Sequence, residues 1–416
     1  MAGFLRHPRA CGAALVGCLA LVGLTGAASA NTHTRRVCAV HQLRVVITRP
    51  APPLLATVVH AYAILSVRVR VCRVVGTHAP VPRAARLVRR SGVHRLGRVV
   101  HPTTGTLFAV HLSVPVTHAA GSPIALGVSL AGSPVSGMSE LASYSAMVGA
   151  APHLLMWYRQ WNAPLVSGTE LTATAQRGIT PIITWEPQDP GNPTDPAYGL
   201  PAIAAGAWDS YLTTSAQAAA ATGVPFLINF APEMNGAWEP WGPGHNANSP
   251  AQYIASYRHM VEIFRAHGAT NVGWVWAPNA DANAQRVYAS YYPGDGWVDW
   301  VGLDGYNVGT TGADGWKTPA QIFGCSSAAV VGLTTPPVII QETAPSELAG
   351  SKALWIGDLA QIIPADFPAV RALVWFERNK ETDWRVESSQ TALAAFQNLA
   401  ANPAWAGPGP AVHPGG

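Results

Sequence analysis

Two glutamates, Glu233 and Glu342, each end an apolar run of the kind that forms a buried strand. The runs cover residues 226–232 and 338–341. A carboxylate at the end of such a run is costly unless a site uses its charge. Two carboxyl groups that face each other about 5 to 5.5 Å apart can cleave a glycosidic bond with retained configuration, one as general acid and base, the other as nucleophile. This pair is therefore the first candidate for chemistry.

Short apolar runs alternate with longer segments of helical composition from residue 122 onward. This rhythm predicts repeated βα units and a parallel sheet. Helices are expected over 202–221 and 250–267, the second starting from a Ser249 cap and a first-turn Pro250. The span 122–403 suits an α/β fold of the (β/α)8 TIM barrel type, which takes about 250 residues. Its eight expected strands are 124–131, 153–159, 180–186, 225–233, 271–277, 298–306, 337–343 and 370–376.

A barrel of this type carries its reactive groups at the carboxyl ends of its strands. The fourth and seventh strands lie across the barrel from each other, so Glu233 and Glu342 are expected to face each other over the mouth. Further polar and aromatic residues end the third to eighth strands and are expected on the same rim: Trp185, Glu186, Trp276, Asn279, Asp304, Tyr306, Trp375 and Glu377.

The charge of the chain is split into two parts. The first Asp or Glu of the 416 residues is Glu140, so residues 1–139 carry a formal charge of +15 and the rest −11. All 15 Trp lie in the acidic part. Because charge and composition change together, a domain boundary near residue 120 is expected. The high hydrophobic content of 49% excludes a chain that is disordered throughout.

The basic segment, residues 31–120, is expected to form a small all-β, sandwich-like accessory domain. Its Val, Ile and Leu runs lie at 43–48, 54–62, 67–75 and 107–114, separated by Pro, Gly and Ser. Its arginines could bind an anionic cell-wall polymer, or could simply form solvated strand faces. The segment contains no Trp, which argues against stacking on single-stranded nucleic acid.

Residues 1–30 have the pattern of a secretory signal peptide. Arg6 and Arg9 precede an apolar stretch of about 14 residues, and small residues at 28–30 suit cleavage. The stretch is short of the roughly 20 residues that a membrane-spanning helix needs, and no membrane span is expected. We therefore expect a secreted, extracellular protein.

Three cysteines remain after cleavage. We expect a disulfide between Cys38 and Cys72 in the basic segment, and a buried free thiol at Cys325. The expected organisation is thus a signal peptide (1–30), an accessory domain (31–120), a barrel domain (121–405) and a disordered Pro/Gly tail (406–416). No spacing of histidines or acids predicts a metal site, and no cofactor is expected.

Several motifs in the barrel segment together resemble a known family. The segment 231–236, Ala-Pro-Glu-Met-Asn-Gly, is followed by Trp238, Pro240, Trp241 and Gly242, and looks like the acid/base motif of glycoside hydrolase family 26, whose members include secreted endo-β-1,4-mannanases. Further matches lie at 156–158, 182–187, 291–295, 299–307, 375–376 and 379–385. The resemblance covers residues 122 to about 400 and does not reach the basic segment.

The resemblance implies roles for individual residues. Glu233 matches the general acid/base and Glu342 the nucleophile, while Tyr306 matches a tyrosine near the nucleophile. Trp238 and Trp375 match aromatics that line sugar subsites, where an indole face packs on a sugar. The candidate substrate-binding residues in these motifs and at these strand ends are Trp185, Asn235, Trp238, Trp241, Tyr306 and Trp375.

Two positions depart from the family pattern. The family commonly has His directly before the acid/base and Arg three residues earlier, where this chain has Pro232 and Asn229. Because both carboxylates are present, the departures put the substrate in doubt more than the reaction. The expected function is a retaining endo-β-glycosidase acting on β-1,4-mannan-type polysaccharide. The alternatives are mixed-linkage β-glucan or β-1,3-xylan as substrate, or a barrel that binds cell-wall polysaccharide without cleaving it.

Overall fold

The computed structural model divides the chain into two compact units, each described here by itself. In the first, it describes backbone pairing for residues 35–48, 62–75, 87–89, 92–94, 97–100 and 107–110. In the second, it describes residues 122–414 except 133, 135–137, 281–283 and 313–314.

The described residues of the first unit form three antiparallel strand pairs. They are β1 (Arg35–Thr48) with β2 (Tyr62–Val75), β3 (Leu87–Arg89) with β4 (Gly92–His94), and β5 (Gly97–Val100) with β6 (Leu107–Val110). Cys38 lies directly opposite Cys72 in the β1–β2 register. The Cys38–Cys72 disulfide and the sandwich arrangement stay predictions, and the expected run at 54–62 and the signal segment 1–30 lie, apart from Tyr62, outside the described residues.

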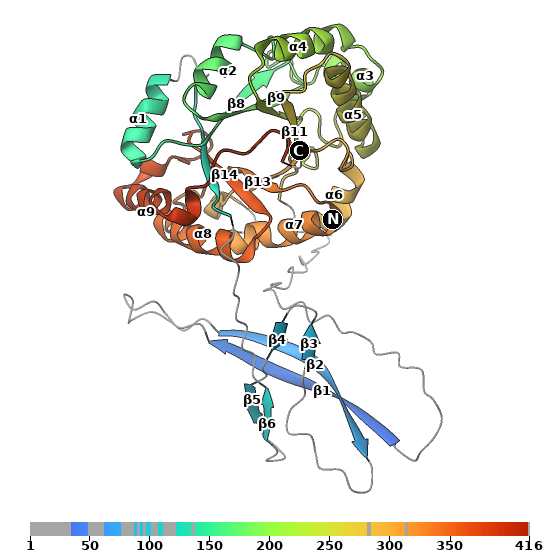
Figure 1. Ribbon diagram of the computed structural model, residues 1–416, viewed down its shortest axis with the longest axis vertical. Coiled ribbons are helices and arrows are strands. Elements are labelled where there is room, and N and C mark those ends of the chain that lie inside the picture. Colours follow the sequence, from blue (N-terminus) through green and yellow to red (C-terminus); the bar gives the residue numbers. More distant parts are fainter. Residues whose placement is uncertain are drawn as a thin grey trace, which may run out of the picture. The chain divides into compact units, whose positions relative to one another are not determined.

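The second unit is built on a closed barrel of parallel strands, which confirms the predicted (β/α)8 fold (Figure 1). Around the barrel the order is β10-β11-β12-β13-β14-β7-β8-β9, so neighbours in sequence are neighbours in space. All eight expected strands are present, within a few residues of the expected ends: β7 (Ala125–Ser129), β8 (Leu154–Gln160), β9 (Thr180–Glu186), β10 (Phe226–Phe230), β11 (Val272–Trp276), β12 (Trp300–Asp304), β13 (Val338–Thr343) and β14 (Val370–Phe376).

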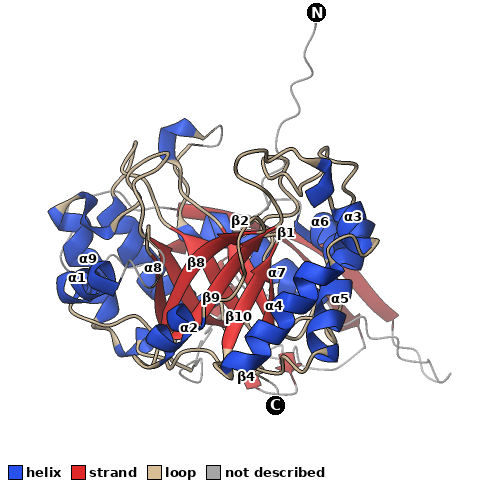
Figure 2. Ribbon diagram, turned by 90° about the horizontal axis from the view of Figure 1, so that it is seen from above, coloured by secondary structure: helices blue, strands red, loops and turns tan. Residues whose placement is uncertain are grey.

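Helices surround these strands (Figure 2). The predicted helix at 250–267 begins as expected, with the Ser249 side chain accepting from the Gln252 amide and Pro250 in the first turn. The expected helix at 202–221 is divided in two. The helices of the described residues are α1 (Met138–Val148), α2 (Gly168–Ala175), α3 (Leu200–Ala204), α4 (Asp209–Thr222), α5 (Pro250–Ala266), α6 (Ala284–Tyr291), α7 (Pro319–Leu333), α8 (Lys352–Asp366) and α9 (Gln390–Ala400).

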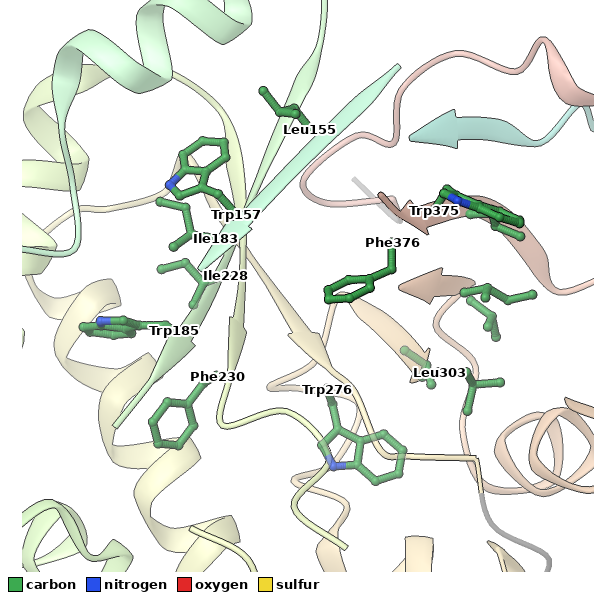
Figure 3. Packing of buried hydrophobic residues seen from close by; sticks show 14 of the residues in the cluster. Leu155, Trp157, Ile183, Trp185, Ile228, Phe230, Trp276, Leu303, Trp375 and Phe376 are labelled. Carbon is green, nitrogen blue, oxygen red and sulfur yellow. The ribbon is translucent and has the colours of Figure 1, made fainter. Parts of the chain in front are cut away.

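Side chains alternate between two apolar layers. One set fills the barrel interior, including Met156, Ile182, Leu227 and Ile339. The other set packs between strands and helices, and Figure 3 shows part of it, with Trp157, Trp185, Trp276 and Trp375 among the labelled residues. Alternation along each strand therefore decides which residues reach the mouth and which meet the helices.

The segment after Trp405 packs against the barrel, so the prediction of a disordered tail at 406–416 is wrong for residues 406–414. The Trp300 indole N–H donates to the Ala411 carbonyl at 2.9 Å, and Val412 packs against the interior apolar layer. The Thr180 hydroxyl donates to the Pro410 carbonyl at 3.3 Å. Thr180 starts its strand, so this segment covers the end of the barrel opposite the carboxyl ends of the strands.

Cys325, on α7, is disulfide-bonded, so the prediction of a free thiol is wrong. Its partner lies outside the residues whose side chains the structure describes. Within the described residues, no helix combines the length and apolar character needed to cross a membrane.

Candidate active site

Glu342 lies near the end of β13 with only 9% of its surface exposed. Each of its carboxyl oxygens accepts a tyrosine hydroxyl: Tyr158, from β8, donates to Oε1 at 2.6 Å, and Tyr306, after β12, donates to Oε2 at 2.8 Å. Burial raises the pKa of both phenols, so both remain protonated donors at neutral pH. The two hydroxyls orient the carboxyl group and stabilise its ionised form.

Glu233 lies just after β10, in a backbone held away from ordinary strand geometry. Ala231 and Glu233 have φ values of 47° and 53°, in the left-handed region that costs a non-glycine residue energy. Two backbone hydrogen bonds fix the segment, from the Ala231 amide to the Trp185 carbonyl at 3.0 Å and from the Glu233 amide to the Ala277 carbonyl at 2.8 Å. The strained backbone is thus tied to the strands on either side of β10.

Two donors hold the Glu233 carboxyl group. Asn279 Nδ2 donates to Oε1 at 2.5 Å, and the Trp238 indole N–H donates to Oε2 at 2.6 Å. The Trp238 ring passes so close to Gly236 that a Cβ there would lie 2.3 Å from it, so only glycine fits. Trp238 itself is 60% exposed, which leaves its ring available to a ligand.

The charge of Glu233 influences the ionisation of Glu342. Burial raises the pKa of Glu342 to about 7, the charge of Glu233 adds to the rise, and the two tyrosine donors oppose it. Burial also raises the pKa of Glu233, against the effect of its Asn279 and Trp238 donors. A pair in which each charge disfavours the other tends to carry one proton, the state that acid and nucleophile catalysis needs.

Further carboxyl groups surround the pair. Glu186, at the end of β9, accepts from Gln160 at 2.5 Å and from Gln188 at 3.2 Å. Burial, followed by the charges of Glu186, Glu233 and Glu342, raises the pKa of Glu239 to about 8. The positive charge of Lys380 favours ionisation of Glu186, Glu233 and Glu239.

The two tyrosines are themselves supported by packing. The Tyr306 ring lies 5.0 Å from the Trp384 ring and 5.5 Å from Phe376. The Arg378 guanidinium lies over the Tyr158 ring, 4.9 Å from its centre, and donates to the Leu130 carbonyl at 2.5 Å. Neither phenol can swing freely away from Glu342.

Three predicted sugar-binding tryptophans are structural instead. Trp185 and Trp375 are fully buried on the helix-facing side of their strands, and Trp241 is 1% exposed. Their indole N–H groups donate to Tyr211, to the Trp384 carbonyl and to the Pro232 carbonyl, respectively. A ring with no exposed face cannot stack on a sugar, so the substrate-binding interpretation of Trp185, Trp241 and Trp375 is wrong for this structure.

Asn235 supports the site indirectly. Its side chain accepts from the Asn279 backbone amide at 2.9 Å and donates to the Asn279 carbonyl at 3.0 Å. Asn235 thus positions Asn279, and its role in binding sugar stays a prediction. Asn279, expected only as a rim residue, contacts the Glu233 carboxyl group directly.

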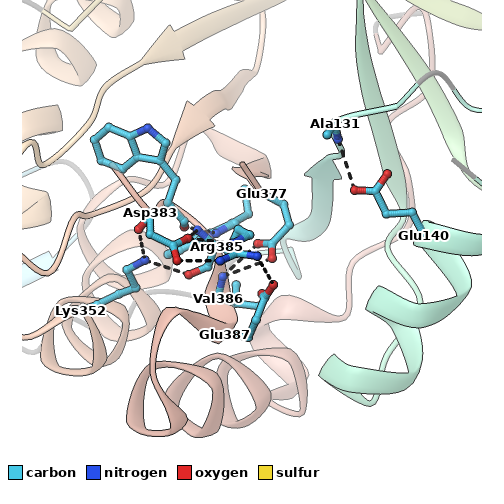
Figure 4. Close-up of polar contacts among 10 residues, drawn as sticks. Ala131, Glu140, Lys352, Glu377, Asp383, Arg385, Val386 and Glu387 are labelled. Carbon is cyan, nitrogen blue, oxygen red and sulfur yellow. Dashed lines mark hydrogen bonds and ion pairs between the residues drawn. The ribbon is translucent and has the colours of Figure 1, made fainter. Parts of the chain in front are cut away.

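Two of the rim residues lie away from the mouth. Trp276 is fully buried against Tyr288 and Tyr292. Glu377 accepts from the Val386 amide at 3.0 Å and lies in a polar cluster with Glu387, Arg385, Asp383 and Lys352 (Figure 4). Both residues belong to the shell between strands and helices.

The sequence interpretation missed Tyr158 and Gln160 as site residues. A signal was available, because Leu154 and Met156 occupy the barrel interior and the next inward positions of β8 are 158 and 160. No group of three or more His, Cys, Asp or Glu suited to a metal ion occurs among the residues described.

Comparison with known proteins gives the same family as the sequence motifs. Residues 209–344, which include both glutamates, match the model of glycosyl hydrolase family 26. Endoglucanase H of Acetivibrio thermocellus is 40% identical over 230 residues, covering 54% of this chain and 25% of that protein. A mannan endo-1,4-beta-mannosidase of Bacillus subtilis is 29% identical over 186 residues, covering 42% of this chain and 44% of that protein. The chain thus spans less than half the length of either relative.

Solved structures share the fold at low sequence identity. A family 26 β-mannanase from Bacteroides ovatus matches with a TM-score of 0.52 and 18% identity, over 70% of this chain and 91% of that one. A modular endo-β-1,4-mannanase from Cellulomonas fimi matches with a TM-score of 0.54 and 19% identity, over 68% and 71% of the two chains. The family model over residues 209–344 and the shared fold agree with the sequence motifs in making this barrel similar to glycosyl hydrolase family 26.

Proposed function

We propose that the barrel is a retaining endo-β-glycosidase that hydrolyses β-1,4-mannan-type polysaccharide. The observation that carries the proposal is the pair Glu233 and Glu342. Each carboxyl group is held by two hydrogen-bond donors, and the charge of Glu233 raises the pKa of Glu342. Pairing of a protonated and an ionised carboxyl group is the arrangement that double displacement requires.

In the first step, the Glu342 carboxylate attacks the anomeric carbon while Glu233 gives its proton to the leaving oxygen. The glycosidic bond breaks and a glycosyl ester forms on Glu342. In the second step, Glu233 removes a proton from water, and the resulting hydroxide equivalent displaces Glu342 from the anomeric carbon. The protonation states of both residues are restored.

Two features support these roles. Glu342 is the more buried residue and receives two phenolic hydroxyls, which stabilise the carboxylate that attacks. Glu233 is partly exposed. A general acid/base must reach both the leaving group and a water molecule, and this exposure allows both contacts. The exposure of the Trp238 ring and its hydrogen bond to Glu233 support a role in stacking on a sugar beside the bond that is cleaved.

Mixed-linkage or related β-glucan is the second candidate substrate. The specific observation in its favour is the 40% identity over 230 residues to a protein named Endoglucanase H. Pro232 and Asn229, where the family commonly carries His and Arg, leave the substrate more open than the reaction. Asn229 is fully buried in the barrel, so its effect on substrate choice would act through neighbouring groups.

The test measures reducing-sugar release from β-mannan, mixed-linkage β-glucan and β-1,3-xylan. We expect release by the wild type, loss of at least about 10³-fold in Glu342→Ala, and no loss in Glu262→Gln, an exposed acid on α5. Product that first appears as the β-anomer supports retention, and an early fall in viscosity supports endo action. Binding of a polymer without release would favour the non-catalytic alternative.

Secretion is part of the proposal and rests on the residues at 1–30 alone. The N-terminal sequence of protein recovered from culture medium should begin after residue 30. Recovery only from the cell interior with residues 1–30 intact would contradict it. Binding of an anionic polymer by the basic segment stays a prediction.

A further inference from the structure

Four polar side chains lie inside the barrel next to the proposed catalytic pair. Thr184, Asn229 and Gln341 each follow an inward-facing apolar residue by two positions on β9, β10 and β13. Asp304, on β12, pairs with Glu342 in the sheet register. All four are fully buried. They are called the polar layer below.

The polar layer contains several buried polar atoms without a hydrogen-bond partner in the described structure. They are Thr184 Oγ1, both polar atoms of the Asn229 side chain and Gln341 Oε1. The carboxyl oxygens of Asp304 form no hydrogen bond of ordinary geometry, and the Glu342 backbone amide is the one donor that acts on the Asp304 carboxyl group in the described structure. An unpaired buried polar group is costly, and a buried charge without a partner is far more so. The folded protein can therefore bury the polar layer without a large loss of stability only if the layer carries little charge.

The side-chain charges with the largest effect on Asp304 are negative. Glu342, on β13, has the largest effect, followed by Glu233 and Glu239 from the segment after β10. No cation is among the main influences on Asp304, and the backbone amide of Glu342 offsets them only in part. Burial and these three acids together raise the pKa of Asp304 well above its ordinary value.

We propose that Asp304 is a positioning residue that acts as an uncharged acid, completing the polar layer and leaving the negative charge beside it to Glu342. The proposal rests on the proposed function for the role of Glu342 as nucleophile. An ionised Asp304 beside Glu342 would favour protonation of Glu342 and so remove the nucleophile. A protonated carboxyl group, by contrast, offers both a donor and an acceptor to its neighbours.

The backbone fixes the two residues relative to each other. The Gly305 amide donates to the Glu342 carbonyl at 2.9 Å, and the Ala280 amide donates to the Asp304 carbonyl at 2.7 Å. The register between β12 and β13 shifts at Leu303 and Asp304, which brings Asp304 opposite Glu342. Glu342 therefore cannot move away from a charge on Asp304 without disturbing two strands.

The first test needs no activity. Asp304→Asn replaces the acid by a neutral group of the same shape, and Asp366→Asn makes the same change at an exposed position at the end of α8. A group whose folded pKa is raised contributes less stability as pH rises above its unfolded value. The quantity to follow is the difference in melting temperature between Asp304→Asn and the wild type. We expect this difference to grow in favour of the variant by about 3 °C per pH unit from pH 4 upward.

The Asp366→Asn difference should stay flat over the same range. A flat or falling difference for Asp304→Asn would overturn the proposal, because it would mean that the native protein holds Asp304 ionised. Infrared difference spectra give an independent measurement on folded protein: the wild type at pH 7 should show a protonated-carboxyl band that is missing from Asp304→Asn.

The second test uses kinetics on the substrate found above. Asp304→Leu should lower kcat at least tenfold, and Asp304→Asn should recover most of this loss without moving the acid limb of the kcat/KM profile. A shift of that limb to lower pH in Asp304→Asn would show that a negative charge had been removed, against the proposal. If no substrate is hydrolysed, the proposed function fails, while the stability and infrared results still decide the protonation state of Asp304.

Discussion

The Tyr158 hydroxyl and the Glu342 carboxyl group lie 184 positions apart in sequence and are joined by a 2.6 Å hydrogen bond. Tyr158 comes from β8 and Glu342 from β13, with β14 and β7 between them in the barrel. Closure of the barrel is therefore what brings donor and acceptor together. The ionisation of Glu342 therefore depends on a hydrogen bond from β8, a strand near the start of the barrel domain.

Tyr158→Phe should slow the reaction and move its pH dependence. Loss of a hydrogen bond to a charged group costs about 1.5–3 kcal/mol, so kcat should fall about 10- to 100-fold. Because this donor lowers the pKa of Glu342, its loss should move the acid limb of kcat/KM to higher pH. The measurement is a pH–rate profile, with Tyr211→Phe as a control because Tyr211 bonds Trp185 and Ala163 and not the carboxyl pair.

Glu233→Gln should separate the two steps of the proposed reaction. Without the acid, natural polysaccharide should be cleaved at least about 100-fold more slowly, whereas an activated aryl glycoside should still form the glycosyl ester. Equal losses on both substrates would contradict the assignment of Glu233 as the acid.

Trp238→Ala should reduce activity more than stability, and Trp375→Ala should reduce stability. Trp238 is 60% exposed and bonds Glu233, so its loss should reduce kcat/KM and change the melting temperature little. Trp375 is fully buried against Trp355 and Phe396, and its truncation should cost about 3–5 kcal/mol of unfolding free energy. Thermal unfolding and steady-state kinetics on the two variants check this. A stable Trp375→Ala protein with weakened substrate binding would restore the sugar-binding interpretation.

Glu377→Gln should stabilise the protein at high pH. Burial, followed by a hydrogen bond and charge from Glu387, raises the pKa of Glu377 to about 9. The raised pKa means that the wild type loses stability as pH rises from about 4.5, the ordinary value, toward 9. Glutamine can still accept from the Val386 amide, so its melting-temperature advantage should grow over this range. An advantage that does not change with pH would contradict the predicted protonation of Glu377.

Removal of residues 406–416 should destabilise the barrel. The deletion loses the Trp300–Ala411 and Thr180–Pro410 hydrogen bonds and the packing of Val412 in the barrel interior. It also exposes interior apolar surface at that end, so the melting temperature should fall by several degrees. A variant lacking only residues 415 and 416 is the control. Equal melting temperatures for the two deletions would show that the 406–414 segment contributes nothing.

The sequence by itself determined the barrel, its eight strands and the position of both glutamates. Each strand is a short, nearly continuous apolar run, and such runs need helices on their outer face and side chains filling their inner face. Glu233 and Glu342 could be singled out because each ends one of these runs. Their motifs also gave the family without knowledge of any contact.

The tertiary structure alone decided which neighbouring residues serve the pair. Trp185 and Glu186 are adjacent in sequence, yet one is sealed against the helices and the other lies at the mouth, because successive side chains of a strand point to opposite faces. Asn235 holds Asn279, which lies 44 positions later in the chain. The segment 406–414 packs on the barrel through contacts such as that between Ala411 and Trp300. Such contacts depend on strand register and barrel closure, which no local pattern of residues records.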